Sequence, residues 1–537
     1  MSKNLRALSA RHARGKTLFQ ALTETLEDTV GTQQTRLTAL ASARLVSPAT
    51  LLGSASFYDF LYTQGTTKRA YLCNGTSCRL SGKQPGALET LSQHHASHEI
   101  GEATCLGHCY CGGAYWQNGC TYDAAHGPGM PDSAGDGATG VPFFPATTAS
   151  LFADDISSLD EFYQAAFLSA DRIIDALSAS GLRGRGGAGF YFADKLSTCA
   201  GMPPGRKYVV CNGDEGDPGA FSDRYLLEQT PHRVLMGMLA AGLAAGADTG
   251  YLYIRAEYPE ALRCMAEAIN AFEATTAYAR GGFQFHLICG AGSYICGEET
   301  ALLNSIEGLR PEVRVRPPYP AQEGLFGKPT LLSNVETFAA IPWILQHGGT
   351  AFADLGTKNS TGTKLVCLDA GFNKPGVHEV EMGTSLQTVL NELGGGFRRT
   401  TKAVQVGGPL GGIVPLEHIA ALTLDFESFA REGFLLGHAG IIAIPQDFPM
   451  IDLLRHLFAY MASESCGKCL PCRLGTEKGY HMLQQACAGS PLDKALFDEL
   501  LDTLELGSLC ALGGGLPLPV RNVLQYFSTE LEEYFQP

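Results

Sequence analysis

The spacing of apolar residues predicts helices at both ends of the chain and an alternating helix–strand region between them. Residues 18–30 and 35–45 place apolar side chains three and four positions apart, the period of an amphipathic helix. A longer helix is predicted over 158–180 by the same spacing. Short apolar runs such as KYVV and YLYI predict buried strands, and residues 361–445 are rich in such runs. The last 90 residues return to helical spacing.

This pattern predicts an α/β multidomain protein. Residues 121–150 are rich in Gly, Pro, Ala, Ser and Thr, a composition typical of a linker or a long surface loop. No internal repeat is evident. We expect the following units: a helical segment at 1–65, a small cysteine-bearing domain at 66–120, a linker at 121–150, a large α/β domain at 151–355, a β-rich domain at 356–447 and a helical domain at 448–537.

Composition narrows the possible functions. A chain of 537 residues corresponds to roughly three to five domains. Its net charge of −15 disfavours binding to nucleic acid or to an anionic membrane. The basic start lacks the apolar core of a signal peptide, which leaves an organelle transit peptide as the alternative to a helix start. The longest apolar stretch, 234–247, is too short and too glycine-rich to span a bilayer. We therefore expect a cytoplasmic protein without membrane insertion.

Four cysteines near the N-terminus have metal-ligand spacing. They form two pairs, Cys73-x4-Cys78 and Cys105-x3-Cys109. Two pairs of thiolates on two loops suit a [2Fe–2S] cluster, since each iron takes two soft ligands. Zinc is the alternative, although zinc sites favour two-residue gaps within a pair. Cys111 competes with Cys109 as the fourth ligand.

A second set of cysteines lies near the C-terminus. Cys466, Cys469 and Cys472 follow one another at three-residue steps, and Cys510 lies far downstream. Three thiolates in one such run with a distant fourth are typical of a [4Fe–4S] cluster. In a reducing compartment, both sets of cysteines indicate metal centres rather than disulfides.

Glycine is abundant, with 64 residues gathered in clusters that indicate close approach to a ligand. One cluster, GLRGRGGAGF (181–190), contains Gly184, Gly186 and Gly189 in a G-x-G-x-x-G pattern. A dinucleotide fingerprint needs a strand before it, whereas a helix is predicted here, so an ordinary Rossmann βαβ site is disfavoured. The loop can still present backbone N–H groups to a phosphate or a flat ring.

Three further segments carry polar residues beside glycines or prolines. A predicted strand ends at Asn212-Gly213 and is followed by Asp214, Glu215 and Asp217. These carboxylates can accept hydrogen bonds from ribityl or ribose hydroxyls, or bind a divalent cation. The other two are GAGSYICGEETALLNSIEG (290–308) and the proline-rich RVRPPYPAQEGLFGKPTLLSNVETFA (314–339).

Taken in this order, the motifs RGRGGAGF, CNGDEGDPGAF, GSYICGEETALLNSIEG, KPTLLSNVET and ESCGKCLPCR closely resemble the flavin-containing, NADH-oxidising subunit of respiratory complex I. This resemblance covers about residues 155–530. Residues 15–120 resemble the small thioredoxin-like subunit of the same complex. Such fusions are typical of the diaphorase (beta) subunits of soluble NAD-dependent formate dehydrogenases and of bidirectional hydrogenases. The stretch 407–434 is more similar to the formate dehydrogenase group.

The resemblance implies a fold for each domain. It implies a thioredoxin-like ferredoxin domain at 66–120, a Rossmann-like FMN domain at 151–355 and a ubiquitin-like β-grasp (SLBB-like) domain at 356–447. A helical bundle around the [4Fe–4S] cluster would occupy 448–537.

The resemblance also implies site residues. Glu215 and Glu299 would orient the reacting rings and repel the extra phosphate of NADP. The FMN ligands would be Gly184, Gly186, Lys195, Asn212, Asp214, Glu215, Tyr294, Gly297, Glu298, Glu299 and Asn334. The NAD contacts would be Phe190, Asp217, Arg316 and Tyr319. Of these, Asp217, Arg316 and Tyr319 depart from the usual Glu, Lys and Phe, as does Ser333 from Asn.

The implied function is that of an NADH/NAD+ oxidoreductase subunit. Hydride would pass between NAD(H) and FMN, and single electrons would pass through the clusters to or from a large catalytic subunit of formate dehydrogenase type, within a hetero-oligomer. The alternatives are a hydrogenase diaphorase, a complex I subunit, or, in another class, a non-catalytic iron–sulfur or zinc scaffold.

Overall fold

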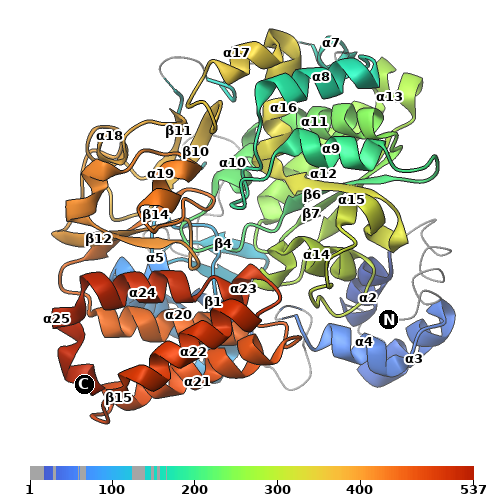
Figure 1. The fold of residues 1–537 in the computed structure, drawn as a ribbon. Coiled ribbons are helices and arrows are strands. Elements are labelled where there is room, and N and C mark those ends of the chain that lie inside the picture. Colours follow the sequence, from blue (N-terminus) through green and yellow to red (C-terminus); the bar gives the residue numbers. More distant parts are fainter. Residues whose placement is uncertain are drawn as a thin grey trace.

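The computed structural model describes residues 17–27, 32–58, 60, 68–123, 140–146, 150–153, 158–164 and 166–536. The described chain is a mixed α/β protein in which a parallel sheet, a mixed six-stranded sheet and a C-terminal group of helices lie beside one another (Figure 1).

The parallel sheet contains β6 (Tyr208–Gly213), β7 (Thr249–Ile254), β8 (Gln284–Cys289) and β9 (Thr330–Asn334), in the order β8-β7-β6-β9. Parallel neighbours require long crossover connections, and helices supply them here. Side chains alternate between the two faces, since Val209 belongs to one buried cluster and Val210 to another. Helices cover the Val209 face: α8 (Ala170–Ser180), α9 (Phe192–Ala200), α10 (Ser222–Gln229), α11 (Pro231–Ala245), α12 (Pro259–Glu273) and α16 (Val335–His347).

The Val210 face is covered by the N-terminal helices together with α14 (Glu299–Ile306). These helices are α2 (Leu18–Glu27), α3 (Gln33–Arg44) and α4 (Pro48–Ala55). Phe19 and Leu22 are buried in the same cluster as Tyr253. The Tyr58 hydroxyl lies 2.7 Å from Ser305 Oγ, on α14. The helices predicted near the N-terminus are therefore present, and they complete the core of the parallel sheet.

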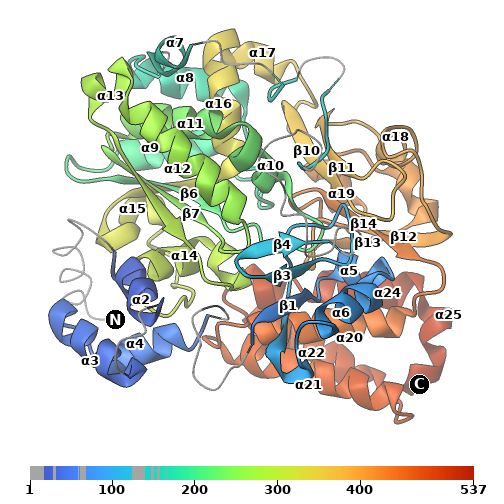
Figure 2. The ribbon, with the colours of Figure 1, turned by 180° about the vertical axis from the view of Figure 1, so that it is seen from behind.

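A small sheet carries the N-terminal cysteines, with the strand order β2-β1-β3-β4. Its strands are β1 (Ala70–Cys73), β2 (Ile100–Ala103), β3 (Tyr115–Gln117) and β4 (Cys120–Tyr122), accompanied by α5 (Thr76–Leu80) and α6 (Gln84–Ser92). β1 is parallel to β2 and antiparallel to β3. In Figure 2, the view from behind, this sheet lies toward the viewer, close to both the parallel sheet and the C-terminal helices.

The six-stranded sheet has the order β13-β12-β14-β10-β11-β5. Its strands are β5 (Phe143–Phe144), β10 (Thr363–Leu368), β11 (Gly376–Glu381), β12 (Thr401–Val406), β13 (Gly412–Pro415) and β14 (Gly440–Pro445). Residue Phe143 pairs with Val377, so a piece of the expected linker 121–150 is an edge strand of this sheet. Residues 124–139 lie outside the described residues.

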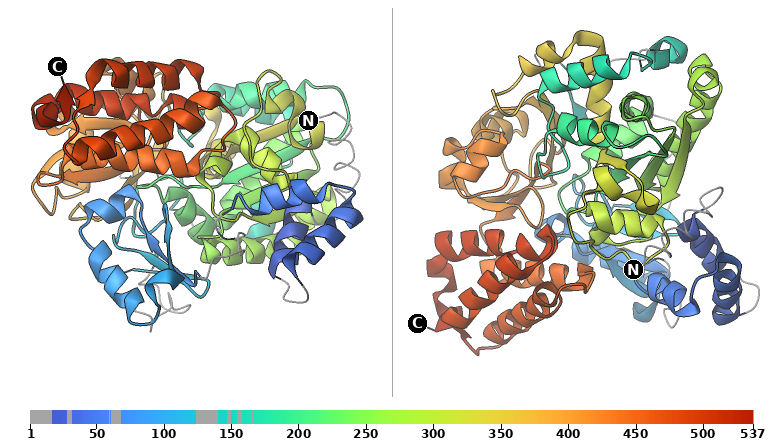
Figure 3. Two further views of the ribbon diagram at one scale, coloured as in Figure 1. Left: turned by 90° about the horizontal axis from the view of Figure 1, so that it is seen from below. Right: turned by 45° about the vertical axis from the view of Figure 1, so that its right-hand side comes forward.

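The C-terminal region is helical, as predicted. It contains α20 (Met450–Glu464), α21 (Leu470–Cys487), α22 (Lys494–Gly507), α23 (Ala511–Gly514), α24 (Pro517–Tyr526) and α25 (Ser528–Leu531). Figure 3 shows these helices as a layer beside the six-stranded sheet. Leu453 and Leu457 of α20 are buried in one cluster with Ile442 and Ile444 of β14.

The single helix predicted over 158–180 is wrong. The structure has two helices, α7 (Leu159–Gln164) and α8, because Ser169 caps α8 by accepting a hydrogen bond from Arg172 N at 3.4 Å. None of the described helices combines the length and the apolar character that a membrane crossing requires.

Candidate functional site

The glycine loop after α8 forms a tight turn. Gly184 N donates to Phe190 O at 2.7 Å, which closes the loop on itself. A Cβ on Gly186 would lie 2.9 Å from Asn334 Cβ, so a larger residue there would displace Asn334. As predicted, a helix and no strand precedes the loop. The loop ends at Phe190, which is 61% exposed, and α9 then carries Lys195.

Two asparagines end neighbouring parallel strands beside this loop. Asn212 of β6 is in register with Asn334 of β9, so the fold brings residues 122 positions apart to the same carboxyl edge. Asn212 Nδ2 donates to Gly297 O at 2.8 Å, and Asn334 Oδ1 accepts from Glu336 N at 2.9 Å as the N-cap of α16. In open α/β sheets, ligands bind outside this edge.

Asp214 follows β6 and has a buried carboxylate oxygen, Oδ2, without a hydrogen-bond partner. Burial raises the pKa of Asp214 well above its ordinary value, with Arg255 opposing. A Cβ on Gly297 would lie 3.2 Å from Asp214 O, so these two backbones approach closely. A buried acceptor without a partner at the edge of a parallel sheet fits a ligand hydroxyl, as FMN would supply.

Glu215 is buried against the start of α10. Its carboxylate accepts hydrogen bonds from Asp223 N at 3.0 Å and Arg224 N at 3.1 Å. It also accepts from the hydroxyls of Ser222 and Tyr258 at 3.2 Å each. Burial raises the pKa of Glu215, although these donors favour the charged form. The structure therefore places the Glu215 side chain on a helix N-terminus.

Glu299 lies between two cations. Its oxygens are 3.0 Å from Lys195 Nζ and 2.8 Å from Arg316 Nη1. Burial alone would favour the neutral acid, but the two cations hold the pKa of Glu299 below its ordinary value. The adjacent Glu298 is the N-cap of α14 and accepts from Thr300 N and Ala301 N, each at 2.9 Å. Tyr319 is 54% exposed on the proline-rich loop that carries Arg316.

Tyr294 connects this edge to other parts of the fold. Its hydroxyl donates to Asp217 Oδ1 at 2.8 Å, and its backbone N–H donates to Glu464 Oε2 at 2.9 Å. The other oxygen of Glu464 accepts from Thr104 Oγ1 at 2.8 Å, next to Cys105. Glu464 thus joins the segments that carry both cysteine sets to Tyr294.

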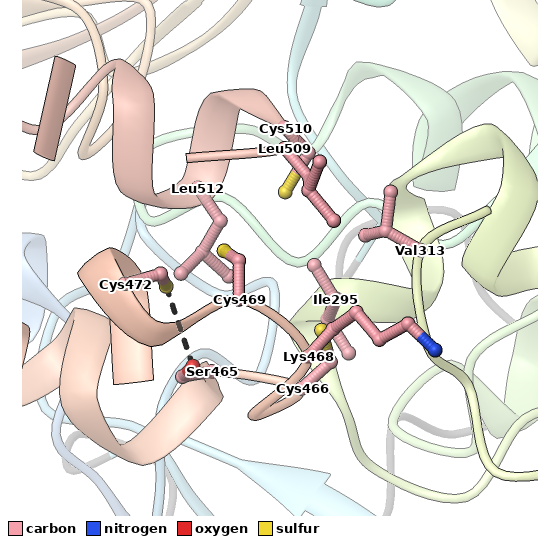
Figure 4. Close-up of a pocket in the computed structure, with 10 residues that line it drawn as sticks. All are labelled: Ile295, Val313, Ser465, Cys466, Lys468, Cys469, Cys472, Leu509, Cys510 and Leu512. Carbon is pink, nitrogen blue, oxygen red and sulfur yellow. Dashed lines mark hydrogen bonds between the residues drawn. The ribbon is translucent and has the colours of Figure 1, made fainter. Parts of the chain in front are cut away.

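The C-terminal cysteines line one pocket (Figure 4). Cys466 lies on the turn between α20 and α21, Cys469 is the N-cap of α21, and Cys472 lies in its first turn. Cys510 is the N-cap of α23. Burial raises the pKa of Cys472 to about 11 and that of Cys510 to about 12. Thiols that resist ionisation without a cation fit a bound cluster, whose irons stabilise thiolates. The remaining lining residues are Ile295, Val313, Ser465, Lys468, Leu509 and Leu512.

The comparisons with known proteins agree with both sites. Residues 177–343 match the Nuo51 FMN-binding domain, and residues 452–534 match the NADH-ubiquinone oxidoreductase-F iron-sulfur binding region. The second F-type subunit of NADH-quinone oxidoreductase in Rhizobium meliloti (strain 1021) is 39% identical over 379 residues, which cover 68% of this chain and 89% of that protein. The chain belongs to the family of NADH-quinone oxidoreductase F-type subunits. It is an NAD-dependent flavin iron–sulfur oxidoreductase subunit.

This family includes relatives in other complexes. NADP-reducing hydrogenase subunit HndC of Solidesulfovibrio fructosivorans is 39% identical over 376 residues, 67% of this chain and 76% of that protein. The crystal structure of an NAD+-reducing [NiFe]-hydrogenase in the H2-reduced state contains a chain with a TM-score of 0.86 and 29% identity. That likeness covers 97% of this chain and 94% of the hydrogenase chain. It therefore extends beyond the region shared with the curated relatives, into the N-terminal part.

In this member of the family, the N-terminal cysteines lie near the carboxyl ends of two adjacent parallel strands, with Cys78 in α5. Cys73 ends β1 and Cys105 follows β2. Cys73, Cys78, Cys105 and Cys109 are all buried, and the Cys105 and Cys109 sulfurs are 3.9 Å apart. Cys111 is half-buried, and burial together with Asp123 raises its pKa well above the ordinary value. In the described part of the chain, no three His, Cys, Asp or Glu side chains converge closely enough to hold one metal ion.

Sequence reasoning missed Arg255 and Glu464. Arg255 directly follows β7, at the same carboxyl edge as Asn212, and donates to Cys105 O at 2.5 Å and to Glu215 O. Its position after a predicted strand could have revealed it. Glu464 reaches the site only through tertiary contacts, and no local pattern marks it.

Proposed function

We propose that this subunit exchanges hydride between NAD(H) and FMN and passes single electrons through iron–sulfur clusters to or from a catalytic partner subunit. The observation that carries this proposal is the adjacency of the two sites. Tyr294, at the flavin edge, directly precedes Ile295, which lines the pocket of the four C-terminal thiols. When bound, FMN supplies the chemistry that couples two-electron and one-electron steps.

The chain's own residues would hold FMN at the edge of the parallel sheet. Gly184 and Gly186 would allow the ring or phosphate to approach the backbone, and Asp214 offers its unpartnered oxygen to a hydroxyl. The amides of Asn212 and Asn334 flank this position. Lys195 would donate to the flavin and, with Arg316, would keep Glu299 ionised. Tyr294, Gly297 and Glu298 would shape the opposite wall.

NAD(H) would enter from the exposed side of this edge. Phe190 and Tyr319 are exposed aromatic side chains suited to stacking, and Arg316 offers a cation to the pyrophosphate. The carboxylate of Glu299 would disfavour a second phosphate on the ribose, which selects NAD over NADP. The Glu215 side chain, which faces α10, would act by holding the 214–219 loop in place.

We also propose a [2Fe–2S] cluster on Cys73, Cys78, Cys105 and Cys109, in a thioredoxin-like domain at 66–120. The burial of all four thiols supports this assignment. The six-stranded sheet would form the β-grasp domain at 356–447, because β10 and β11 form a hairpin and β14 pairs with β10 in parallel. The [4Fe–4S] domain would be 448–537.

For the partner, we propose a large catalytic subunit of formate dehydrogenase type, in a cytoplasmic hetero-oligomer. The support is the similarity of residues 407–434 to that group. A hydrogenase-type partner is the second candidate, favoured by the structural likeness to the NAD+-reducing [NiFe]-hydrogenase chain over 97% of this chain. Copurification of the native complex, followed by NAD+ reduction with formate or with hydrogen, distinguishes the two.

The cofactor proposal is tested on the purified chain. We expect one FMN, about six irons by the stoichiometry of the two clusters, and NADH-dependent reduction of ferricyanide. The isolated chain should show no activity with formate or hydrogen. Zinc in place of iron, or a protein without flavin, would favour the non-catalytic scaffold instead.

A further inference from the structure

Asn212 and Asn334 use their side-chain amides in the same way at the carboxyl edge of the parallel sheet. Asn212 Oδ1 accepts a hydrogen bond from Asp214 N at 3.1 Å, and Asn334 Oδ1 accepts one from Glu336 N at 2.9 Å. A backbone N–H can only donate, so the atom that it contacts in each amide must be the oxygen. The two N–H groups of each amide are therefore left for other partners.

Each amide gives one of these N–H groups to the protein. Asn212 Nδ2 donates to Gly297 O at 2.8 Å, and Asn334 Nδ2 donates to Asp223 Oδ2 at 2.6 Å. Among the described residues, neither amide has a partner for its second N–H. Since the oxygen and one N–H of each amide are held, the direction of the second N–H is fixed, and it suits an acceptor atom of a ligand.

The acceptor for Asn334 is itself buried. Asp223 lies in the first turn of α10 and is 4% exposed. Its backbone N–H donates to Glu215 Oε1 at 3.0 Å, while its carboxyl group accepts from Asn334. Asp223 therefore joins the segment after β6 to the end of β9, through its backbone on one side and its side chain on the other.

The environment of Asp223 disfavours its negative charge. Burial, together with the carboxylates of Glu215 and Glu336, raises the pKa of Asp223 well above its ordinary value, with Lys364 and the Asn334 hydrogen bond opposing. Asp223 therefore serves Asn334 mainly with an acceptor oxygen, and a neutral amide at the same position can supply that atom.

The glycine loop packs against the same amide. A Cβ on Gly186 would lie 2.9 Å from Asn334 Cβ and 3.4 Å from its Nδ2. The Asn334 side chain thus lies between the backbone of the glycine loop and the carboxyl group of Asp223. A change in the orientation of this amide would alter the surface that the loop and the strand end present to a ligand.

We propose that Asp223 is a positioning residue for the flavin site, acting through Asn334. This inference rests on the proposed function, because the orientation of the Asn334 amide matters only if FMN binds at this edge. Asp223 accepts one N–H of the amide and thereby keeps the second N–H available to FMN. Without this acceptor, the amide can turn and present its oxygen, which repels the acceptor atoms of a phosphate or a flavin ring.

Four substitutions test this role. Asp223→Ala removes the acceptor but keeps the backbone N–H that Glu215 accepts. Asp223→Asn keeps an acceptor oxygen on a side chain of the same length, so it is the conservative variant. Asn334→Ser keeps an oxygen that can cap α16 but removes both N–H groups of the amide. Asp369→Asn is the matched control, because it replaces another buried carboxyl whose hydrogen-bond partners lie outside the flavin edge.

The dissociation constant of FMN is measured on the flavin-depleted protein by fluorescence quenching, and the melting temperature of each variant is recorded. We expect Asp223→Ala to raise this dissociation constant about three- to tenfold, the range of one hydrogen bond. Asp223→Asn should remain within about twofold of wild type, and Asp369→Asn should leave FMN binding unchanged. In the Asn334→Ser protein, Asp223→Ala should cause no further loss, because the N–H groups that it acts on are gone.

An unchanged FMN dissociation constant in Asp223→Ala would overturn the proposal. A defect in Asp223→Asn or Asp369→Asn as large as that in Asp223→Ala would overturn it as well, as would a further loss in the Asn334→Ser protein. Failure of the proposed function is a distinct outcome, since wild-type protein would then not bind FMN. If Asp223→Ala does not fold, Asp223→Ser, whose hydroxyl is too short to reach Asn334, takes its place in each comparison.

Discussion

Gly219 N donates a hydrogen bond to the Cys109 sulfur across 3.2 Å. This contact joins the loop that begins at the flavin edge with Asp214 to the buried cysteine set of the small sheet. A backbone donor to a thiolate ligand stabilises its negative charge and tunes the attached metal centre. The flavin site and the N-terminal cysteine site are therefore in direct contact through one short loop.

The same contact predicts which thiol is the fourth ligand of the N-terminal cluster. Cys109→Ser should lower the iron content from about six to about four per chain, by the stoichiometry of a [2Fe–2S] cluster. Cys111→Ser is the matched control two residues away and should keep all the iron. Iron analysis and electron paramagnetic resonance of the reduced protein measure both. If only Cys111→Ser lost iron, Cys111 and not Cys109 would be the fourth ligand.

Glu299→Gln should lower kcat/KM for NADH about tenfold. It should also reduce the preference of the enzyme for NADH over NADPH. The physical reason is that the variant leaves Lys195 and Arg316 without their shared carboxylate, so two cations face the nucleotide. Steady-state kinetics with NADH and with NADPH measure the ratio of the two kcat/KM values. Glu273→Gln, an exposed change on α12, is the control. An unchanged ratio with normal flavin content would contradict this role for Glu299.

Glu215→Ala should lower NADH-dependent dye reduction at least about tenfold at unchanged iron content, because the 214–219 loop loses its anchor on α10. The variant also leaves two N–H groups at a helix start without their acceptor, so thermal stability should fall too. Glu215→Gln keeps an acceptor oxygen but loses the negative charge. It therefore distinguishes the effect of the charge from the effect of capping α10. Normal NADH kinetics in Glu215→Ala would show that Glu215 is not needed to hold the 214–219 loop in place.

Cys469→Ser should separate flavin reduction from electron delivery. The four-thiol pocket would lose its cluster, so NAD-linked turnover of the whole complex should be lost while NADH still bleaches the flavin. Cys487→Ser, at the exposed end of the same helix, is the control. If turnover persisted in a variant shown to lack the cluster, electrons would leave by another route, and the N-terminal cysteine site would be the candidate.

Asp369 provides a test of stability against pH. Burial raises the pKa of this carboxyl to about 7, against hydrogen bonds from Ser77 Oγ, Gly371 N and Ala443 N. The folded state therefore binds the proton more tightly than the unfolded chain. The free energy of unfolding should fall by about 4 kcal/mol as the pH rises from about 4 to about 7.

The variant Asp369→Asn should lack this slope, since its side chain is neutral at every pH. Melting temperatures of wild type and variant are compared between about pH 4 and pH 8, so that the contributions of other titrating groups cancel in the difference. We expect the variant to gain stability relative to wild type as the pH rises. Parallel curves for the two proteins would show that Asp369 does not titrate in this range.

The sequence alone determined the parts of this protein that depend on local spacing. Helical spacing over residues 18–30 and over the last 90 residues predicted helices, and the structure has helices at Leu18–Glu27 and Met450–Glu464 there. The cysteine run 466–472 predicted a metal loop, because ligand spacing is fixed by the chain itself.

Tertiary structure decided what depends on segments far apart in the chain. Asn212 and Asn334 lie side by side because β6 and β9 are parallel neighbours in the sheet. The order of strands in a sheet cannot be predicted from the sequence of either strand. Glu215 faces α10, and Asp217 faces His438, because the directions of these side chains follow from the packing of other elements. The short strand β5 exists only because the edge of β11 offers unpaired backbone groups. Such contacts are set by the burial of whole surfaces, which no local pattern of residues encodes.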